Sequence, residues 1–163
     1  MALNDRTSNL EHGPITIEFC NSLSFQVSRH PIFGLVVSEP FPKLAYIIFE
    51  LESYIGIYTI DTESGALTEK EIVQLLPNPA STDYAAEIEI CSDKKFLYAS
   101  NRKTDNSNGA IVVFEIKNDG SLDRIQVQPV MGSTPRHFKV SMFFNFCTLY
   151  FKGRLNFFKD APR

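Results

Sequence analysis

Cysteine is scarce in this sequence of 163 residues: there are three, at widely spaced positions. An odd number without close pairs predicts neither a disulfide framework nor a metal site of the C-x-x-C type. The residues around Cys20, Cys91 and Cys147 are mostly apolar. The sequence therefore predicts buried free thiols, since a reduced cysteine behaves as a small hydrophobic residue.

Positive charge and long apolar runs are also lacking. The 16 Lys and Arg are outnumbered by 19 Asp and Glu, and no run of Lys and Arg is longer than two residues. Binding to nucleic acid needs a basic stripe that neutralises phosphates, so no nucleic-acid partner is expected. No apolar stretch approaches the roughly 18 residues of a membrane span, and the first ten residues contain no apolar signal segment. We expect no membrane partner and a cytoplasmic location.

Several motifs of catalysis and metal binding are missing as well. The sequence contains no G-x-S-x-G elbow, no phosphate-binding loop, no paired-cysteine zinc set and no EF-hand pattern. Hydrolysis through a serine nucleophile and phosphoryl transfer therefore have no support. We expect neither a metal nor an organic cofactor.

What the sequence does contain is a series of short runs rich in β-branched and aromatic residues, with almost no helical periodicity. Such runs between turn signals are typical of β-strands. Turns are predicted at 62–65 and 117–120, where Gly and Asn tolerate the positive φ of tight hairpins. The clearest predicted strands are 35–38, 44–49, 55–60, 88–91, 96–100 and 110–116.

An internal repeat organises these strands. Tyr46, Tyr98 and Tyr150 end similar apolar runs and lie 52 positions apart each time (46 to 98, 98 to 150). After each of the first two tyrosines come a second strand, a turn that closes on glycine, and a further strand. Each unit thus supplies four short antiparallel strands in about fifty residues, which is typical of a propeller blade.

The repeat predicts an all-β fold, a β-propeller fragment of about three four-stranded blades that does not close into a ring. We place the first blade at 29–78, the second at 79–130 and a truncated third at 131–163, while 1–28 match poorly and could be outer strands of a preceding blade. Propellers bury blade faces by packing four to eight blades around a channel. Three blades leave two faces uncovered, so self-association is possible.

The second unit carries a longer and more specific signature. Residues 83–102 read DYAAEIEICSDKKFLYASNR, residues 61–68 read DTESGALT, and residues 134–138 read TPRHF. These segments resemble the seven-bladed lactonase family that contains bacterial 6-phosphogluconolactonase and fungal carboxymuconate cyclase. That family carries A-A-E-I followed by S-P-D-G-x-F-L-Y-x-S-N-R, a D-x-x-T-G-x-L-T turn, and a P-R-H/N-F strand entry.

The resemblance implies a site at the mouth of the channel, where arginines, a histidine and a glutamate bind an acidic sugar lactone or a muconate without a metal. Arg102 matches the arginine of S-N-R, and Glu50 matches the glutamate that ends the family's Y-V-x-N-E strand, with Phe49 in place of the usual Asn. The family's first P-R-H segment is replaced here by 33–35, with Arg-His displaced upstream to 29–30.

The same residues can be judged by their chemistry. Arginine binds carboxylates and phosphates in a bidentate manner, and hydrolysis of a ring ester needs a base for water and a donor for the oxyanion. We predict Glu50, Arg102 and His137 as catalytic residues. We predict Arg102, Arg136 and Glu87 as substrate-binding residues.

Each candidate also has a plain structural interpretation. Arg102 could be an exposed loop cation, Glu50 a solvent-facing edge residue, and Glu87 part of a half-solvated strand that alternates with isoleucine. His137 with Arg136 could serve a blade-to-blade hydrogen bond. The hypothesis is a lactone hydrolase that acts on an anionic lactone, an incomplete or degenerate member of its family. The alternatives are an inactive fragment that serves as an interaction surface, and a carboxymuconate cyclase-like activity.

Overall fold

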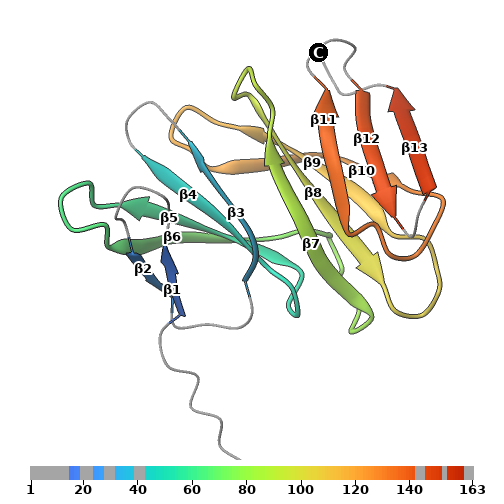
Figure 1. Cartoon of the computed structure of the whole chain (residues 1–163), viewed down its shortest axis with the longest axis horizontal. Coiled ribbons are helices and arrows are strands. Elements are labelled where there is room, and N and C mark those ends of the chain that lie inside the picture. The colour runs from blue at the N-terminus through green and yellow to red at the C-terminus, as the bar shows by residue number, and fades with distance from the viewer. Residues whose placement is uncertain are drawn as a thin grey trace, which may run out of the picture.

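The computed structural model describes the backbone of residues 15–18, 24–27, 32–38, 43–141, 146–151 and 154–159, and the side chains of Val36 and 43–140. Every regular element in this part of the chain is a β-strand (Figure 1). Among these residues, no helix is long and apolar enough to cross a membrane. The strands are β1 (Ile15–Glu18), β2 (Ser24–Val27), β3 (Ile32–Ser38), β4 (Leu44–Phe49), β5 (Tyr54–Ile60), β6 (Leu67–Gln74), β7 (Asp83–Ile90), β8 (Phe96–Lys103), β9 (Ala110–Ile116), β10 (Leu122–Pro129), β11 (His137–Ser141), β12 (Phe146–Phe151) and β13 (Arg154–Lys159).

The strands form antiparallel sheets in chain order. The sheet β3-β4-β5-β6 is blade 1, the sheet β7-β8-β9-β10 is blade 2, and the three-stranded sheet β11-β12-β13 is blade 3, while β1 and β2 pair as a separate hairpin. Short hairpins connect neighbouring strands, which suits antiparallel pairing. The all-β propeller fragment predicted from the repeat is confirmed.

Burial changes across each blade in the way a propeller requires. The first strands of the three blades, β3, β7 and β11, lie next to one another (Figure 1). The middle strands are the most buried, as β4 is buried at every position. The last strands, β6 and β10, are mostly exposed. The first strands are therefore the inner strands of the blades, and the last strands form the outer rim.

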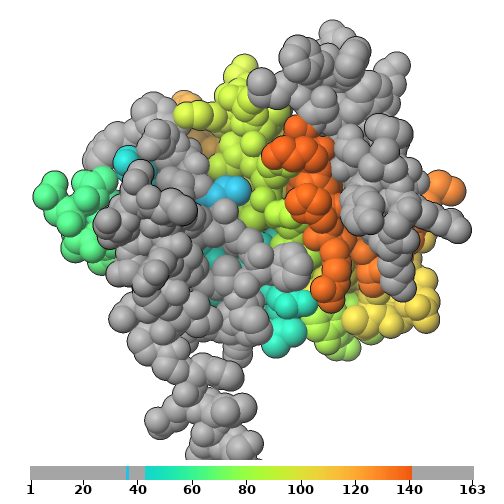
Figure 2. Space-filling model, viewed as in Figure 1, coloured from blue at the N-terminus to red at the C-terminus, as the bar shows by residue number. Residues whose placement is uncertain are grey.

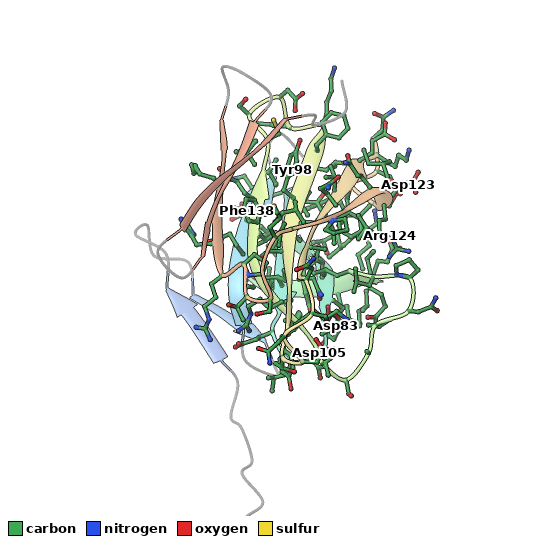
Figure 3. The ribbon with its side chains drawn as sticks, turned by 90° about the vertical axis from the view of Figure 1, so that its right-hand side faces the viewer. Asp83, Tyr98, Asp105, Asp123, Arg124 and Phe138 are labelled. Carbon is green, nitrogen blue, oxygen red and sulfur yellow. The ribbon has the colours of Figure 1, made fainter. Side chains whose placement is uncertain are left out.

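Two apolar layers hold the blades together. Between blades 1 and 2, alternate residues of β4 such as Tyr46 and Ile48 pack with Leu97 and Phe114 of blade 2. Between blades 2 and 3, Phe138 of β11 packs in one cluster with Tyr98 of β8 (Figure 3). Strand alternation gives each blade two opposite apolar faces, and each layer buries one face from each neighbour.

Polar contacts join blades 1 and 2 at the outer rim. Arg124 of β10 donates to the carbonyl oxygens of Gln74 and Leu75, at 2.9 and 3.3 Å (Figure 3). The ammonium of Lys70 donates to the carbonyl oxygen of Asp119 at 2.5 Å. These contacts satisfy backbone groups that the ends of the blades leave unpaired.

Two expectations from the sequence need correction. β8 runs to Lys103, three residues beyond the predicted end at Ser100, so Arg102 lies within the strand instead of after it. The polar residues after Ser100 resemble a loop in sequence, yet Asn101 and Arg102 are buried and paired. Cys91 is a free thiol, as expected, but it is partly exposed. Cys20 and the side chain of Cys147 lie outside the described residues.

Candidate functional site

The inner strands of blades 2 and 3 bring a glutamate and a histidine together. Nδ1 of His137, on β11, contacts Oε2 of Glu87, on β7. The other oxygen of this carboxylate accepts the backbone N–H of Ile88 at 3.1 Å. The Glu87 side chain is 23% exposed and that of His137 is 63% exposed. One edge of the imidazole is thus held by a carboxylate while the rest of the ring is open to solvent.

A second acid–base pair follows two residues further along both strands. The ammonium of Lys139 lies 2.5 Å from Oε1 of Glu89, and the other carboxylate oxygen of Glu89 accepts the N–H of Val140 at 2.9 Å. The hydrogen bond from Lys139 to Glu89 and the negative charge of Glu89 raise the pKa of Lys139 above its ordinary value, so the amine stays protonated at neutral pH. We call the four residues Glu87, Glu89, His137 and Lys139 the inner-strand row.

The inner-strand row lies where two blades meet at the surface. Figure 2 shows residues of β11 (orange) beside residues of β7 (yellow-green) on the face turned to the viewer. Lys139 is 75% exposed, so its ammonium can be reached from solvent. Side chains two positions apart on a strand share one face, about 7 Å apart. His137 and Lys139 therefore present a base and a cation side by side.

Arg102 makes a different kind of contact, between blades 1 and 2. Its Nη2 forms an ion pair with Oε1 of Glu50, in the turn after β4. The same guanidinium donates to the carbonyl oxygen of Ala85 from Nη2 at 3.2 Å and from Nε at 3.4 Å. Its Cζ lies 5.9 Å from the centre of the Tyr84 ring, within range of a cation–π interaction. Arg102 is only 7% exposed, so it reaches across β7 and joins the two blades from a buried position.

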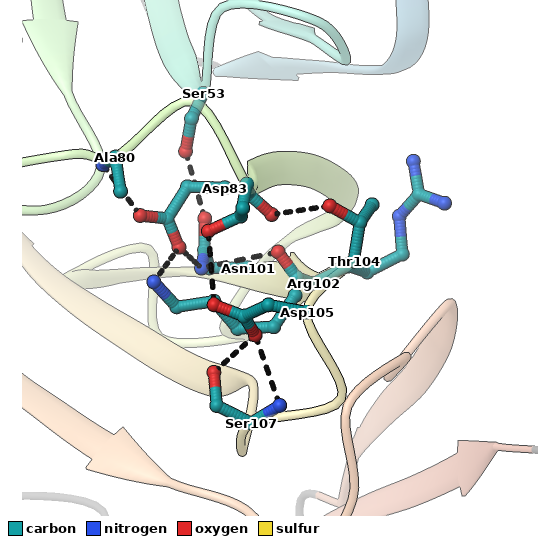
Figure 4. Close-up of polar contacts among 10 residues, drawn as sticks. Ser53, Ala80, Asp83, Asn101, Arg102, Thr104, Asp105 and Ser107 are labelled. Carbon is teal, nitrogen blue, oxygen red and sulfur yellow. Dashed lines mark hydrogen bonds and ion pairs between the residues drawn. The ribbon is translucent and has the colours of Figure 1, made fainter.

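A buried polar network lies beside Arg102, and Figure 4 shows its members. Ser53 of blade 1 donates to the side-chain oxygen of Asn101 at 2.8 Å, and the Asn101 amide donates to Asp83 at 2.6 Å. Lys103 forms an ion pair with Asp83 at 2.7 Å. Burial opposes ionisation of Asp83, but hydrogen bonds from Lys103, from the Ala80 N–H and from Asn101 outweigh it and lower the pKa. The network holds the ends of β7 and β8 against blade 1.

The structure brings together four of the five residues predicted from the sequence, in two separate pairs. Glu50 contacts Arg102, and Glu87 contacts His137. Arg136 is exposed, and its side chain makes no hydrogen bond or ion pair with another described residue. The roles predicted for the five residues remain predictions, because contact alone does not establish a role.

Sequence reasoning missed half of the inner-strand row. Glu89 alternates with isoleucine just as Glu87 does, and Lys139 stands two positions after His137. Strand alternation places both on the same face as the predicted residues, so the i, i+2 spacing was an available signal. Within the described residues, no group of three or more His, Cys, Asp or Glu side chains is arranged to hold a metal ion.

A family model described as lactonase, 7-bladed beta-propeller, matches residues 18–146, which is most of the chain. The chain belongs to this lactonase family. The resemblance that the sequence motifs suggested is therefore confirmed. The sheet order and the burial pattern agree with the propeller fold of this family.

Relatives of this lactonase-family chain include enzymes and solved structures. It is 30% identical over 113 residues to a 6-phosphogluconolactonase of Pectobacterium atrosepticum, which is 69% of this chain and 31% of the relative. A protein structure from Lactobacillus plantarum has a TM-score of 0.62 at 30% identity and covers 78% of this chain and 40% of its own. The periplasmic gluconolactonase of Pseudomonas aeruginosa has the same fold, with a TM-score of 0.66 at 24% identity over 76% of this chain and 34% of its own. The chain spans about a third of the length of such curated relatives.

Proposed function

We propose that this chain takes part in the hydrolysis of a lactone that carries an anionic group, with His137 as the general base. The observation that carries the proposal is the contact between Glu87 and His137 across the two inner strands. Family membership supports it, because relatives are 6-phosphogluconolactonases. A carboxylate on one ring nitrogen orients an imidazole and leaves the other nitrogen to act as a base.

The proposed reaction needs only a proton carrier and water. A neutral His137 accepts a proton from water through Nε2, while Glu87 holds the Nδ1–H and stabilises the imidazolium that forms. The water oxygen bonds to the lactone carbonyl carbon, and the bond from that carbon to the ring oxygen breaks. The proton returns from His137 to the ring oxygen as it leaves as an alcohol. The product is the open hydroxy acid.

We assign to Lys139, which also pairs with Glu89, the binding of an anionic group on the substrate. Its ammonium is exposed, stays protonated, and stands two positions from His137 on the same face of β11. A phosphate or carboxylate on the substrate could pair with it while the ester carbonyl faces the imidazole. This arrangement supports an acidic or phosphorylated sugar lactone as the substrate class.

The test is hydrolysis of 6-phosphogluconolactone by the purified chain, measured as acid release above the spontaneous rate. We expect His137→Ala to lower kcat about 100-fold or more, which is the usual contribution of a general base. Glu87→Gln should lower kcat less, because the base remains but loses its orienting carboxylate.

Glu115→Gln is the matched control, since Glu115 is also an ion-paired glutamate of blade 2 but lies outside the row. A carboxylated muconolactone, assayed in parallel, distinguishes a cyclase-like substrate preference. A folded chain that hydrolyses neither compound would rule out the proposal for the chain acting alone.

A second function, as a non-catalytic interaction module, is favoured by one observation. The arginine that the family resemblance places at the site is buried, and its guanidinium is already bound by Glu50 and by a backbone carbonyl. An arginine used in this way stabilises the contact between blades, and it leaves Lys139 and Arg136 as the exposed cations of β11 and the residue before it. A purified chain that is folded but hydrolyses no lactone would favour this second function.

A further inference from the structure

The inner strand β7 contains a β-bulge that includes Glu87, the first residue of the inner-strand row. Ala85 pairs with Asn101 and Ile88 pairs with Ala99, with a register shift between them. Two residues of β7, Ala86 and Glu87, therefore stand opposite one residue of β8, which is Ser100. A two-to-one count of this kind defines a bulge, and bulges often redirect a side chain beside a functional site.

The bulge decides which way the glutamates of β7 face. Ala85 and Ile88 both belong to the apolar layer between blades 1 and 2, although three positions separate them. In a regular strand, residues on one face are two or four positions apart. Without the extra residue, the alternation from Ala85 would turn Glu87 and Glu89 into that apolar layer. The extra residue reverses the alternation, so that both glutamates face β11 instead.

Two backbone N–H groups at the bulge are satisfied by side chains. The N–H of Glu87 donates to Oγ of Ser100 at 2.9 Å. The N–H of the following residue, Ile88, donates to Oε1 of Glu87 at 3.1 Å. Ser100 is fully buried, so loss of its hydroxyl would leave the buried N–H of Glu87 without this partner. The hydroxyl thus fixes the backbone of Glu87, and the Ile88 N–H fixes its carboxylate.

We propose that Ser100 is a positioning residue for the Glu87–His137 pair and acts by holding the bulge of β7. Its hydroxyl touches neither the histidine nor a substrate. It keeps the Glu87 backbone at the point from which the carboxylate reaches both the Ile88 N–H and Nδ1 of His137. The effect of Ser100 on catalysis rests on the proposed function, whereas its role in holding the bulge and the Glu87–His137 contact does not.

The experiment measures which nitrogen of His137 carries the proton. In a neutral imidazole, the hydrogen-bond partner of one nitrogen selects the tautomer, and the Glu87 carboxylate selects the Nδ1–H form. We expect ¹⁵N NMR of the neutral ring to show mainly that form in the parent chain. Loss of the signal in His137→Ala assigns it. Ser100→Ala should shift the ratio toward the Nε2–H form, in the same direction as Glu87→Gln.

Two further variants separate positioning from a general loss of stability. Ser53→Ala is the matched control, because Ser53 is equally buried and its hydroxyl also makes a hydrogen bond, at 2.8 Å to Asn101. It should leave the His137 tautomer ratio unchanged. Ser100→Thr keeps the hydroxyl and should restore most of the Nδ1–H form.

Activity gives an independent readout. If the proposed hydrolysis occurs, Ser100→Ala should lower kcat about 10-fold or more with a smaller change in KM, since misplacement of a catalytic group by a fraction of an ångström is costly. A tautomer ratio that changes in Glu87→Gln but not in Ser100→Ala would overturn the positioning role and leave the proposed function intact. A ratio that responds in both variants, in a chain without lactone hydrolysis, would uphold the positioning role and contradict the proposed function.

Discussion

Tyr46 is the residue that marks the repeat, and it makes a specific contact between blades. Its side chain is fully buried, and its hydroxyl donates to the carbonyl oxygen of Gly120, in the turn between β9 and β10, at 2.9 Å. Burial, together with the nearby charge of Asp119, raises the pKa of Tyr46 to about 12. The phenol therefore stays protonated and keeps donating its hydrogen bond well into the alkaline range.

This shifted pKa predicts a dependence of stability on alkaline pH. In the unfolded chain the phenol loses its proton near its ordinary pKa of about 10, so ionisation favours unfolding above that value. The contribution of Tyr46 is thus complete below about pH 10 and is lost as the pH rises toward 12.

Tyr46→Phe should lower the free energy of unfolding by about 1–2 kcal/mol at pH 8, because it leaves the Gly120 carbonyl without its donor. It should also lose stability less steeply between pH 10 and 12. Urea unfolding at both ends of that range checks this, and a variant as pH-dependent as the parent would contradict it.

Residue types in the site were predictable, but their partners were not. The motif spacing pointed to Glu87 and His137 separately, and the structure pairs them. The motif also indicated Arg102 as an anion-binding group, whereas Glu50 and the Ala85 carbonyl already bind it. A motif indicates which residue is present at a position, while the neighbouring blade decides what that residue contacts.

At the scale of the element, the turn between β9 and β10 depends on one glycine. Gly120 has a φ of +80°, and a Cβ placed on it would lie 1.9 Å from Cδ1 of Leu44 in blade 1. The glycine is required both by its backbone conformation and by the close approach of the next blade. We expect Gly120→Ala to lower the free energy of unfolding by about 3 kcal/mol, the sum of backbone strain and overpacking.

A double-mutant cycle separates the two causes. Leu44→Ala removes the side chain that the new methyl group would meet, so the double variant should lose less stability than the sum of the single variants. The remaining loss measures the strain at positive φ. If the stability losses of the two single variants simply add in the double variant, as measured by chemical denaturation, then Leu44 does not clash with the new methyl group.

Most elements were predictable from short runs of β-branched and aromatic residues between turn signals, and the exceptions have local causes. The predicted 44–49 and 110–116 match β4 and β9 as observed. The prediction for β7 began at residue 88 instead of Asp83, because the bulge breaks the alternation between Ala85 and Ile88. A period-two pattern cannot reveal a strand that contains an extra residue.

At the scale of the whole molecule, several of the side-chain pairs that join the blades are about one repeat apart in sequence. Glu50 and Arg102 are 52 positions apart, and Glu87 and His137 are 50 apart. The 52-residue spacing of the tyrosines therefore predicts the blades. It also predicts the approximate sequence separation of such partners in neighbouring blades. The cytoplasmic location and the self-association expected from the sequence stay predictions, because the contacts between blades do not test them.

The Glu50–Arg102 pair predicts a large effect for a single charge change and a partial recovery for an exchange. Arg102→Glu should lower the free energy of unfolding by about 3 kcal/mol or more, because it places two carboxylates together at a largely buried position. Glu50→Arg with Arg102→Glu should recover part of that loss. Recovery stays partial because a glutamate at 102 cannot donate to the Ala85 carbonyl. Thermal unfolding of the single and double variants checks the order, and a double variant less stable than Arg102→Glu would contradict it.

The Glu50–Arg102 pair also bears on how similar blades find the correct neighbour during folding. Glu50 follows Tyr46 by four positions, and Arg102 follows Tyr98 by four, so the two residues occupy the same position in successive repeats. Two copies of blade 1 placed side by side would bring two carboxylates together, and two copies of blade 2 would bring two guanidinium groups together. Misassembly of repeats is a common failure of multi-blade chains. Opposite charges at one repeat position favour docking of blade 2 on blade 1 over docking of either blade on its own kind.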